Sequence, residues 1–470
     1  MYVFEPYAVF QSLYRQICES AGIKNPTLQD LKHTFTTFIL QMERENLTAA
    51  EFHIKTLQAH RLGYIYSRST CLCCLSRYPE RGLPCGHTIC EKCIQIFGQK
   101  SNPYGHIFRI SRCPLCGDSR EVTAHIKPPT AGVRLLSIDG GGIRGVLPLQ
   151  ALRSLETTFN YLTGTSGPIQ EHFDLAIGTS SGGLIVFGLF INGWSVGECA
   201  NQFVRLAEKA FSKPRNLLIS IFTSRYSAGG MDEALKEAFG DEKSLIDWSH
   251  ASFPTKVAVT ATTTDTPSAC IFGNYIVEGF QPPDCAQREM RVIWPQPTVM
   301  DIALSLGTGT ASFSASGINW WSRSWLGRVY QSFMTSLDGQ RAWEELQNHL
   351  PEERKARYFR LNHQFEGQEP PIDDLAEMHR LNTPAKEGAT TTTDMEFAEL
   401  LVTKQFYFEL DETPRYIDNR YQCTGYLRCR FQGPKQVKLL NHILKIGGGG
   451  GGPSSVLVVV LASWCSGMNP

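Results

Sequence analysis

The sequence has no excess of charge of either sign and no apolar run long enough to cross a bilayer. Lys plus Arg and Asp plus Glu number 45 each among the 470 residues, so the formal net charge is zero. Because no global field then attracts polyanions, we expect no nucleic-acid partner. The run "VLVVVLASWC" at 456–465 is about half of the ~20 apolar residues that a spanning helix needs. Since six glycines precede it, we interpret 447–470 as a low-complexity tail and not as an anchor.

The N-terminus lacks the pattern of a secretory signal, because "MYVFEPYAVF" contains Glu5 and no basic segment ahead of an apolar run. We therefore expect a cytoplasmic protein that contacts membranes peripherally at most. Cysteine, in contrast, is plentiful: there are 15, an odd number, and eight of them fall within residues 71–116. This clustering in a large chain favours metal ligation over disulfides.

The cysteine-rich segment has the spacing of a zinc module. Two ligands separated by two residues can come from one turn of chain, and eight thiolate or imidazole donors suffice for two tetrahedral zinc ions. The spacing predicts a small domain over 69–120 with two structural Zn²⁺ ions, which folds only with its metal. The eight predicted ligands are Cys71, Cys74, Cys85, His87, Cys90, Cys93, Cys113 and Cys116.

This ligand order resembles the RING finger family. The resemblance implies a cross-brace, in which the first and third ligand pairs bind one ion and the second and fourth pairs bind the other. It also implies docking of a ubiquitin-conjugating enzyme or another protein, with Leu72, Leu75 and Pro114 in the docking face. Gly117 stands where many active RING ligases have Arg or Lys, so ligase activity stays open. We expect the two remaining candidates, Cys73 and His106, to be a spare thiol and a surface residue.

The apolar pattern divides the rest of the chain. Residues 1–68 have apolar residues at helical spacing, which predicts a helical leader with Thr48 as an N-cap. Over 133–315, short apolar strands alternate with apolar helices, which predicts an α/β layered domain. We expect 316–446 to be helical at first and then to form two or three strands in "QFYFELDETPRYIDNRYQCTGYLRCRF".

A glycine-rich motif, "DGGGIRG", follows the first predicted strand of this domain. Gly140, Gly142 and Gly145 also fit a dinucleotide fingerprint, but Asp139 at the mouth of the loop would repel a pyrophosphate and the later acidic residue is missing. Backbone N–H groups of Gly141 and Gly142 at a helix N-terminus would instead stabilise an oxyanion.

A second motif, "GTSSG", is the G-x-S-x-G pattern of a nucleophile elbow, bounded by Gly178 and Gly182. Alone it is equally compatible with an ordinary strand-to-helix turn. Together with an oxyanion loop on the preceding strand, it predicts Ser180 as a nucleophile and leaves Ser181 as a turn residue.

Together, "LLSIDGGGIRGVLPL" and "FDLAIGTSSGG" resemble the patatin-like phospholipase family, in particular fungal forms that carry a RING finger ahead of the lipase domain. The likeness extends over roughly 70–432, including "LSLGTG", "FRLNHQF" and "QFYFEL". It implies a mixed sheet between helices and a phospholipase A-type hydrolase of phospholipid or other acyl-ester lipids, and it does not imply calcium. It further implies that Ser180 attacks the ester, that Gly141 and Gly142 hold the oxyanion, and that Arg144 faces the lipid phosphate; a solvated first-turn arginine is the alternative.

The family pairs its serine with an Asp in a D-G-G or D-G-A motif, and residues 280–300, where that motif is expected, contain neither. Asp284 lies in this interval, Asp301 directly follows it and Asp338 begins a later Asp-Gly, but we expect none of them to replace the catalytic Asp. Either the sequence is an incomplete reading of a gene whose product is a working lipase, or the chain is a pseudo-lipase that acts as a zinc-dependent interaction or ubiquitin-ligase module. A Ser-Asp-His triad with His349 or His363 is a third alternative.

Overall fold

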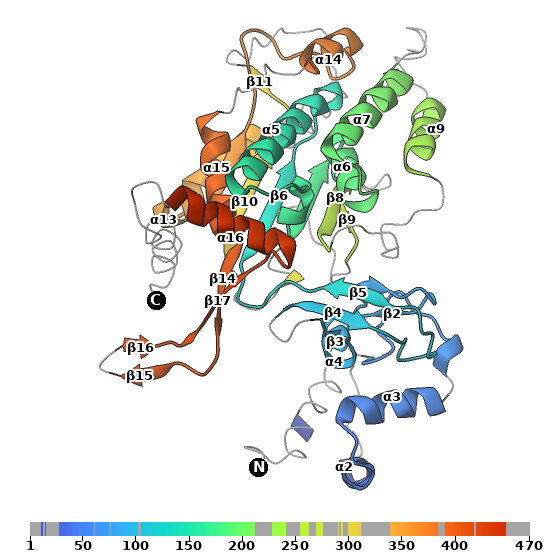
Figure 1. The fold of residues 1–470 in the computed structure, drawn as a ribbon. Coiled ribbons are helices and arrows are strands. Elements are labelled where there is room, and N and C mark those ends of the chain that lie inside the picture. Colours follow the sequence, from blue (N-terminus) through green and yellow to red (C-terminus); the bar gives the residue numbers. More distant parts are fainter. Residues whose placement is uncertain are drawn as a thin grey trace. The chain divides into compact units, whose positions relative to one another are not determined.

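The computed structural model describes residues 11–12, 15, 28–60, 62–75, 77–101, 105–211, 228–240, 254–262, 269–275, 290, 293–294, 299–311, 339–383, 391–417 and 420–447. The chain divides into two compact units, residues 1–124 and residues 125–470 (Figure 1). Within the described residues, no helix combines the length and the apolar character needed to cross a membrane.

The first unit begins with helices and continues into very short strands. Its elements are α2 (Leu28–Glu45), α3 (Ala49–Ala59), η1 (Leu62–Tyr64), β1 (Arg81–Gly82), β2 (Thr88–Ile89), α4 (Glu91–Phe97), β3 (Gln99–Lys100), β4 (Ile107–Ile110) and β5 (Val122–His125). Thr48 caps α3 as predicted, because its side chain accepts from the Glu51 N–H while the Glu51 carboxylate accepts from the Thr48 N–H.

Helix α3 packs directly on the cysteine-rich segment. The Nε2 atom of His53 lies in hydrogen-bond contact with the carbonyl of Cys73, and the His53 ring is stacked near the ring of Phe97, with 6.1 Å between their centroids. Gly63 lies against Cys116, since a methyl group added there would lie 3.0 Å from the Cys116 Cβ. The predicted boundary between a leader and a zinc domain at 68–69 therefore falls inside one compact unit.

The second unit is built on a six-stranded mixed sheet in the order β12-β10-β6-β7-β8-β9, in which only β9 is antiparallel to its neighbour. Its strands are β6 (Val133–Ile138), β7 (Leu175–Thr179), β8 (Lys256–Thr262), β9 (Ala269–Gly273), β10 (Met300–Leu306) and β12 (Tyr358–Leu361). Strands therefore occur within 133–315, as the apolar pattern predicted. The sheet also extends past the predicted boundary at 315, because β12 pairs with β10.

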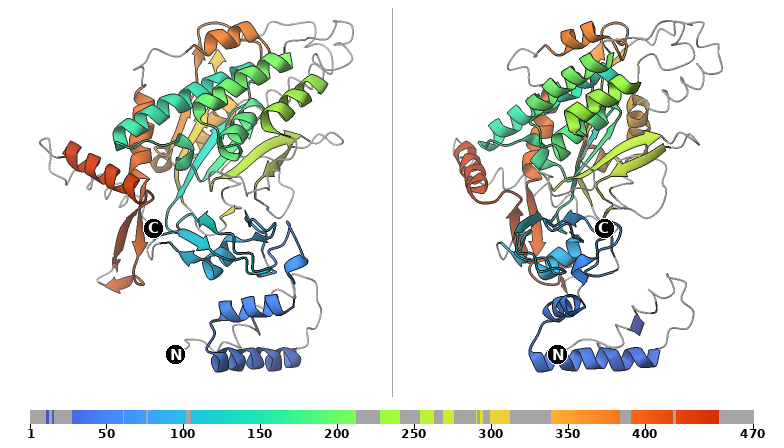
Figure 2. Two further views of the ribbon diagram at one scale, coloured as in Figure 1. Left: turned by 45° about the vertical axis from the view of Figure 1, so that its right-hand side comes forward. Right: turned by 90° about the vertical axis from the view of Figure 1, so that its right-hand side faces the viewer.

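Helices α5 (Val146–Thr163), α7 (Val196–Phe211) and α15 (Thr392–Thr403) cover one face of this sheet (Figure 1 and Figure 2). Along β6, Leu136 and Ile138 face these helices, whereas Val133 and Leu135 face a smaller cluster on the other side, as the period of two in a strand requires. The other helices and connecting turns before the C-terminal part are η2 (Gly142–Gly145), η3 (Ile169–His172), α6 (Ser181–Val186), η4 (Phe187–Ile191), α9 (Ala228–Phe239), α12 (Gly339–His349), α13 (Glu352–Lys355) and α14 (Leu375–Leu381).

The C-terminal part adds a ribbon and a helix. Two antiparallel pairs, β14 (Phe406–Leu410) with β17 (Gly425–Cys429) and β15 (Arg415–Ile417) with β16 (Arg420–Gln422), extend away from the sheet and form an arm (Figure 1). Helix α16 (Pro434–Gly447) follows. Two short strands, β11 (Thr310–Ala311) and β13 (Gln364–Phe365), pair beyond the ends of β10 and β12.

The order of the strands creates a switch point. From β6 the chain proceeds outward through β7, β8 and β9, and then returns to place β10 on the other side of β6. Loops that leave neighbouring parallel strands in opposite directions open a crevice at their carboxyl ends, where ligands bind in open α/β sheets. The loops after β6, β7 and β10 are the "DGGGIRG", "GTSSG" and "GTG" motifs.

Candidate functional site

Ser180 lies on a strained turn between β7 and α6. Its backbone angles are φ 53° and ψ −120°, a region that a residue with a Cβ rarely adopts and that costs of order 1–3 kcal/mol. The side chain is exposed. A strained, exposed serine between a strand and a helix is the geometry of a nucleophile elbow.

Both glycines of the elbow stand where there is no room for a side chain. A methyl group added to Gly178 would overlap the backbone carbonyl of Gly182, and one added to Gly182 would overlap the carbonyl of Ile138 at the end of β6. The turn can therefore close against the neighbouring strand only with glycine at both positions.

The loop after β6 lies directly beside Ser180. A methyl group on Gly140 would lie 2.9 Å from the Ser180 Cβ, and Gly142 adopts φ 58°, the left-handed region. Any side chain on Gly142 would also overlap the carbonyl of Ile372. The sequence motif thus brings its glycines to the nucleophile.

Two hydroxyl groups fix the peptide between Gly140 and Gly141. The Gly140 carbonyl accepts a hydrogen bond from the hydroxyl of Thr308 at 2.9 Å, and the Gly141 N–H donates to the hydroxyl of Ser181 at 3.0 Å. One of the two predicted oxyanion donors is therefore engaged by a protein hydroxyl. Neither Thr308 nor Ser181 was singled out for this role from the sequence, although each lies in a recognised glycine motif.

Asp139, the first residue of the loop, is held by a buried guanidinium group. Its carboxylate pairs with Arg360 at 2.7 Å, and Arg360 also donates to the hydroxyl of Ser305 and the side-chain oxygen of Gln340. The Arg360 side chain is only 6% exposed. This pairing links the loop after β6 to β10, β12 and α12.

Arg144 is neither solvated nor turned toward open space, so the expectation of a solvated first-turn arginine is wrong. Its side chain is 10% exposed and pairs with Glu369 at 2.6 Å, while its Nε donates to the Gly141 carbonyl at 3.4 Å. Glu369 also accepts from the N–H of Ala311, after β10. Through these contacts Arg144 ties the glycine loop to Glu369.

Among the carboxylates weighed as a partner for Ser180, Asp301 is at the wrong end of the sheet. It begins β10, whereas Ser180 follows the end of β7, a parallel strand of the same sheet. It lies 3.5 Å from Arg430 in an ion pair. Asp284 and Asp338 lie outside the described residues.

The two histidines weighed for a triad are also distant from the elbow. His349 ends α12, and its Nδ1 contacts the carbonyl of Glu345 one helical turn earlier. His363 follows β12, which β10 and β6 separate from β7, so three strand spacings of ~4.8 Å lie between their backbones. Within the described residues, no imidazole or carboxylate hydrogen-bonds to Ser180.

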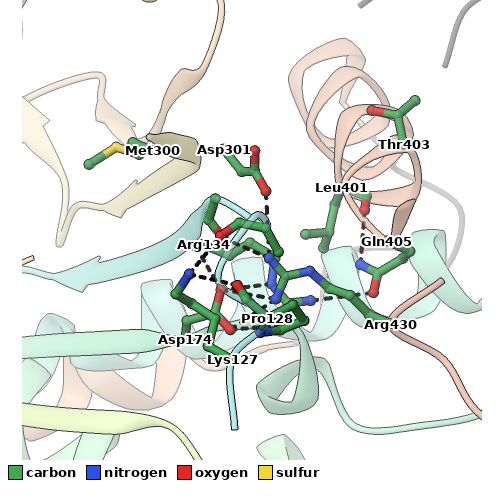
Figure 3. A network of polar contacts seen from close by, with 12 residues as sticks. Lys127, Pro128, Arg134, Asp174, Met300, Asp301, Leu401, Thr403, Gln405 and Arg430 are labelled. Carbon is green, nitrogen blue, oxygen red and sulfur yellow. Dashed lines mark hydrogen bonds and ion pairs between the residues drawn. The ribbon is translucent and has the colours of Figure 1, made fainter. Parts of the chain in front are cut away.

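The opposite end of the sheet carries a buried ion network (Figure 3). Asp174 pairs with both Arg134 and Arg430 at 3.1 Å, and Arg430 also donates to the Gly132 carbonyl and pairs with Asp301. Burial opposes ionisation of Asp174, but the two guanidinium groups outweigh it and hold the pKa of this carboxyl below its ordinary value. The network joins the starts of β6, β7 and β10 to the strand segment near residue 430.

We expect Asp174→Asn to lower the free energy of unfolding by about 3–5 kcal/mol, because two buried guanidiniums lose their shared counter-charge. Urea unfolding of the variant and the wild type measures this difference in the free energy of unfolding. Since the folded-state pKa is lowered, the stabilisation is complete above the ordinary carboxyl pKa of about 4 and is lost as the pH falls below that value toward the folded pKa. Glu412→Gln, which breaks an exposed pair with Arg415, is the matched control and should change stability by less than ~0.5 kcal/mol. Equal losses for the two variants would contradict this role.

The cysteine-rich segment of the first unit brings its eight predicted ligands into two groups. In each group, the donor atoms all lie within 4.8 Å of one another. The groups are Cys71, Cys74, Cys90 and Cys93, and Cys85, His87, Cys113 and Cys116. These are the two sets that the cross-brace implies, while Cys73 and His106 lie in neither.

The donor chemistry and spacing fit zinc. Tetrahedral Zn–S bonds of about 2.3 Å put two ligand sulfurs ~3.8 Å apart, and the Sγ atoms of Cys74 and Cys90 are separated by 3.8 Å. In the second group the Nδ1 atom of His87 lies 3.3 Å from the Cys85 Sγ and 3.7 Å from the Cys113 Sγ, so Nδ1 is the donor available to a metal. The Tyr66 ring stacks on His87 with 4.4 Å between centroids and fixes the imidazole plane.

The residues expected in a protein-docking face differ in exposure. Leu75 is 72% exposed, Leu72 is half-buried and Pro114 is buried. Only Leu75 among the three therefore offers a large apolar surface.

The elbow, the glycine loop and the mixed sheet belong to a known class of domain. Residues 136–287 match the family model described as Patatin-like phospholipase. The matched segment begins in β6 and includes the glycine loop, the Ser180 elbow, β8 and β9. The chain therefore contains a patatin-like phospholipase domain.

Individual relatives are also similar to this chain. Human calcium-independent phospholipase A2-gamma is 32% identical over 152 residues, which cover 31% of this chain and 18% of that protein. Phospholipase A I of Arabidopsis thaliana is 29% identical over 173 residues, covering 31% and 13%. Patatin-like protein 3 of the same plant is 35% identical over 117 residues, covering 20% and 27%. The matches thus span less than a third of the length of each of these relatives.

Proposed function

We propose that the protein is a lipid acyl hydrolase of phospholipase A type with Ser180 as its nucleophile. The observation that carries the proposal is the positive φ of Ser180 on a turn whose flanking glycines cannot be replaced, next to a glycine loop at the switch point of the sheet. Attack of the Ser180 hydroxyl on an ester carbonyl would form an acyl-enzyme and release an alcohol, and water would then release the fatty acid.

The oxyanion would form beside the glycine loop. At the helix N-terminus, Gly142 supplies a backbone N–H, and the positive end of the helix dipole favours the developing charge. Gly141 would contribute its N–H once the carbonyl oxygen of the ester displaces the Ser181 hydroxyl.

The experiment that tests the proposal is covalent trapping with a fluorophosphonate, followed by peptide mass mapping of the full-length protein. Such a probe forms a stable adduct only with an activated serine hydroxyl. We expect the adduct on Ser180 and not on Ser181. An unlabelled protein, or a label on another serine, would contradict the proposal.

The general base is the part of this mechanism that differs from the family pattern. We propose to test Asp284→Asn and Asp338→Asn, the two remaining candidates, for loss of labelling. If neither variant loses labelling and the wild type turns over no ester, the alternative function is favoured: a lipid-binding pseudo-lipase attached to a zinc-dependent protein-interaction or ubiquitin-ligase module. Zinc-dependent self-ubiquitination without ester turnover would favour that alternative directly.

For the first unit we propose two structural Zn²⁺ ions in a RING-type cross-brace. The donor sets and their spacing support this proposal. The exposed Leu75 would contribute to a surface for a protein partner such as a ubiquitin-conjugating enzyme. In this proposal the metal stabilises the fold and takes no part in ester hydrolysis.

Thr308 provides a test of the loop's role in hydrolysis. We expect Thr308→Val to lower kcat about 10-fold with little change in KM, because the Gly140–Gly141 peptide loses the hydroxyl that orients it and the oxyanion donor shifts. Thr308→Ser retains the donor and should keep most of the activity. If both variants lost activity to the same extent, or if only KM changed, the hydroxyl would have no orienting role.

A further inference from the structure

Helix α16 exposes an apolar stripe on the side that faces away from the rest of the second unit. Val437 is 57% exposed, Leu440 41% and Leu444 58%, and their spacing of three and four residues places them on one face. The opposite face is anchored, since Leu439 is fully buried and His442 packs against Gly164 at the end of α5. The exposed stripe is therefore held in a fixed orientation by a packed helix. Figure 2 shows α16 at the outer edge of this unit.

The charges beside the stripe have one sign. Residues 434–447, "PKQVKLLNHILKIG", contain three lysines and no acidic residue. Lys435 pairs with Glu171 at 2.6 Å, whereas Lys438 and Lys445 are exposed. Because an α-helix turns by about 100° per residue, Lys438 and Lys445 lie beside the apolar stripe on a helical wheel. An apolar stripe with lysines along one border is the pattern of a helix that lies in a membrane interface.

We propose that α16 is a docking surface for an anionic lipid membrane, with Val437, Leu440 and Leu444 entering the interface and Lys438 and Lys445 contacting the lipid headgroups. The charge complementarity between an acid-free helix and an anionic surface favours this occupant over a protein groove. Neither its apolar stripe nor its lysines belong to the site around Ser180. Binding of α16 to a membrane would not require ester hydrolysis at Ser180.

The position of α16 determines what such docking could do. Helix α5 begins beside the glycine loop and ends at Gly164, against which α16 packs, so α16 lies near the opposite end of an 18-residue helix. At 1.5 Å per residue that helix spans ~27 Å. Docking through α16 would therefore tether the protein to a surface and raise the local lipid concentration, without sealing the mouth of the Ser180 site.

The test is cosedimentation of the full-length Ser180→Ala protein with vesicles, so that no lipid can be consumed through Ser180. We expect binding to phosphatidylcholine vesicles that contain phosphatidylserine, and at least about 10-fold weaker binding to pure phosphatidylcholine. Lys438→Gln/Lys445→Gln should weaken binding to the anionic vesicles about 10-fold at low salt. Leu440→Ser/Leu444→Ser should weaken it to a similar degree at both low and high salt, because apolar contact is not screened.

Matched controls come from the arm of strands β14–β17. Tyr416→Ser/Tyr421→Ser removes two exposed aromatic side chains and Arg415→Gln/Arg420→Gln removes two cations. All four lie on β15 and β16, which Figure 1 shows at the tip of the arm and apart from α16. We expect these variants to bind vesicles as the parent does. Equal loss in the arm variants, unchanged binding in both α16 variants, or self-association in place of any vesicle binding would overturn the proposal. All of these side chains are exposed, so we expect the substitutions to leave the melting temperature unchanged. Measuring it verifies that each variant is folded.

Discussion

Replacing Ser180 by alanine is expected to lower the rate of lipid-ester hydrolysis by roughly three to six powers of ten, because the variant cannot form the acyl-enzyme. The strained backbone of Ser180 holds its hydroxyl exposed at the carboxyl end of β7. Removing a single oxygen leaves the turn, its glycines and the sheet unchanged. Fatty-acid release from phosphatidylcholine vesicles by the full-length protein measures the effect.

Ser181→Ala is the control for this prediction, since the adjacent hydroxyl accepts from the Gly141 N–H but lies outside the nucleophile position of the motif. We expect this variant to retain activity within about 10-fold of the wild type. The assignment of the nucleophile fails if Ser181→Ala is inactive and Ser180→Ala is active. Loss of activity in both, with a fluorophosphonate label still on Ser180, would assign Ser181 an essential orienting role.

Removal of zinc is expected to unfold the cysteine-rich segment between residues 62 and 124 while the sheet of the second unit stays folded. The strands of this segment are two to four residues long and offer little core of their own. Structural zinc sites contribute about 10–16 kcal/mol in small zinc modules, more than such a segment can replace. Hydrogen exchange of the full-length protein, before and after treatment with a strong chelator, would separate the two units.

Metal analysis of single variants supplies the control. Cys71→Ala removes a ligand of the first group, so the bound zinc should fall from about two ions per chain to about one or none. Cys73→Ala removes a buried thiol that lies outside both groups and should keep both ions. Wild-type protein with far less than two zinc ions, or equal loss in both variants, would contradict the zinc assignment.

The sequence predicted the parts of the fold that depend on local pattern. Apolar strands followed by glycine turns predicted β6 and β7 with their helices, and Thr48 was predicted as a cap from the helical stretch that directly follows it. The ligand pairing of the cysteine-rich segment followed from family resemblance, and the side chains converge in those same two groups.

The parts that were missed depend on partners far away in the sequence. β12 was placed in a helical region because a four-residue strand carries little periodic signal, and only its pairing with β10 identifies it. Arg144 has no local sign of its partner Glu369, which lies 225 residues later. Likewise Asp301 was weighed as a catalytic candidate from its place in the sequence, although the direction of β10 puts it at the end of the sheet opposite Ser180.

The ion pair between Asp174 and Arg430 closes a separation of 256 residues in the chain. At synthesis rates of about 5–20 residues per second, Arg430 follows Asp174 out of the ribosome by roughly 10–50 s. During that interval β6 and β7 can pair, and Arg134 can reach Asp174, but β12 and the second guanidinium have yet to arrive. The nascent sheet therefore has an unpaired edge at β10 or β6, and the Asp174 carboxylate is paired with only one of its two arginines. Until its last strand segments are made, the emerging second unit therefore presents an unpaired strand edge, a feature that makes incomplete sheets prone to aggregation.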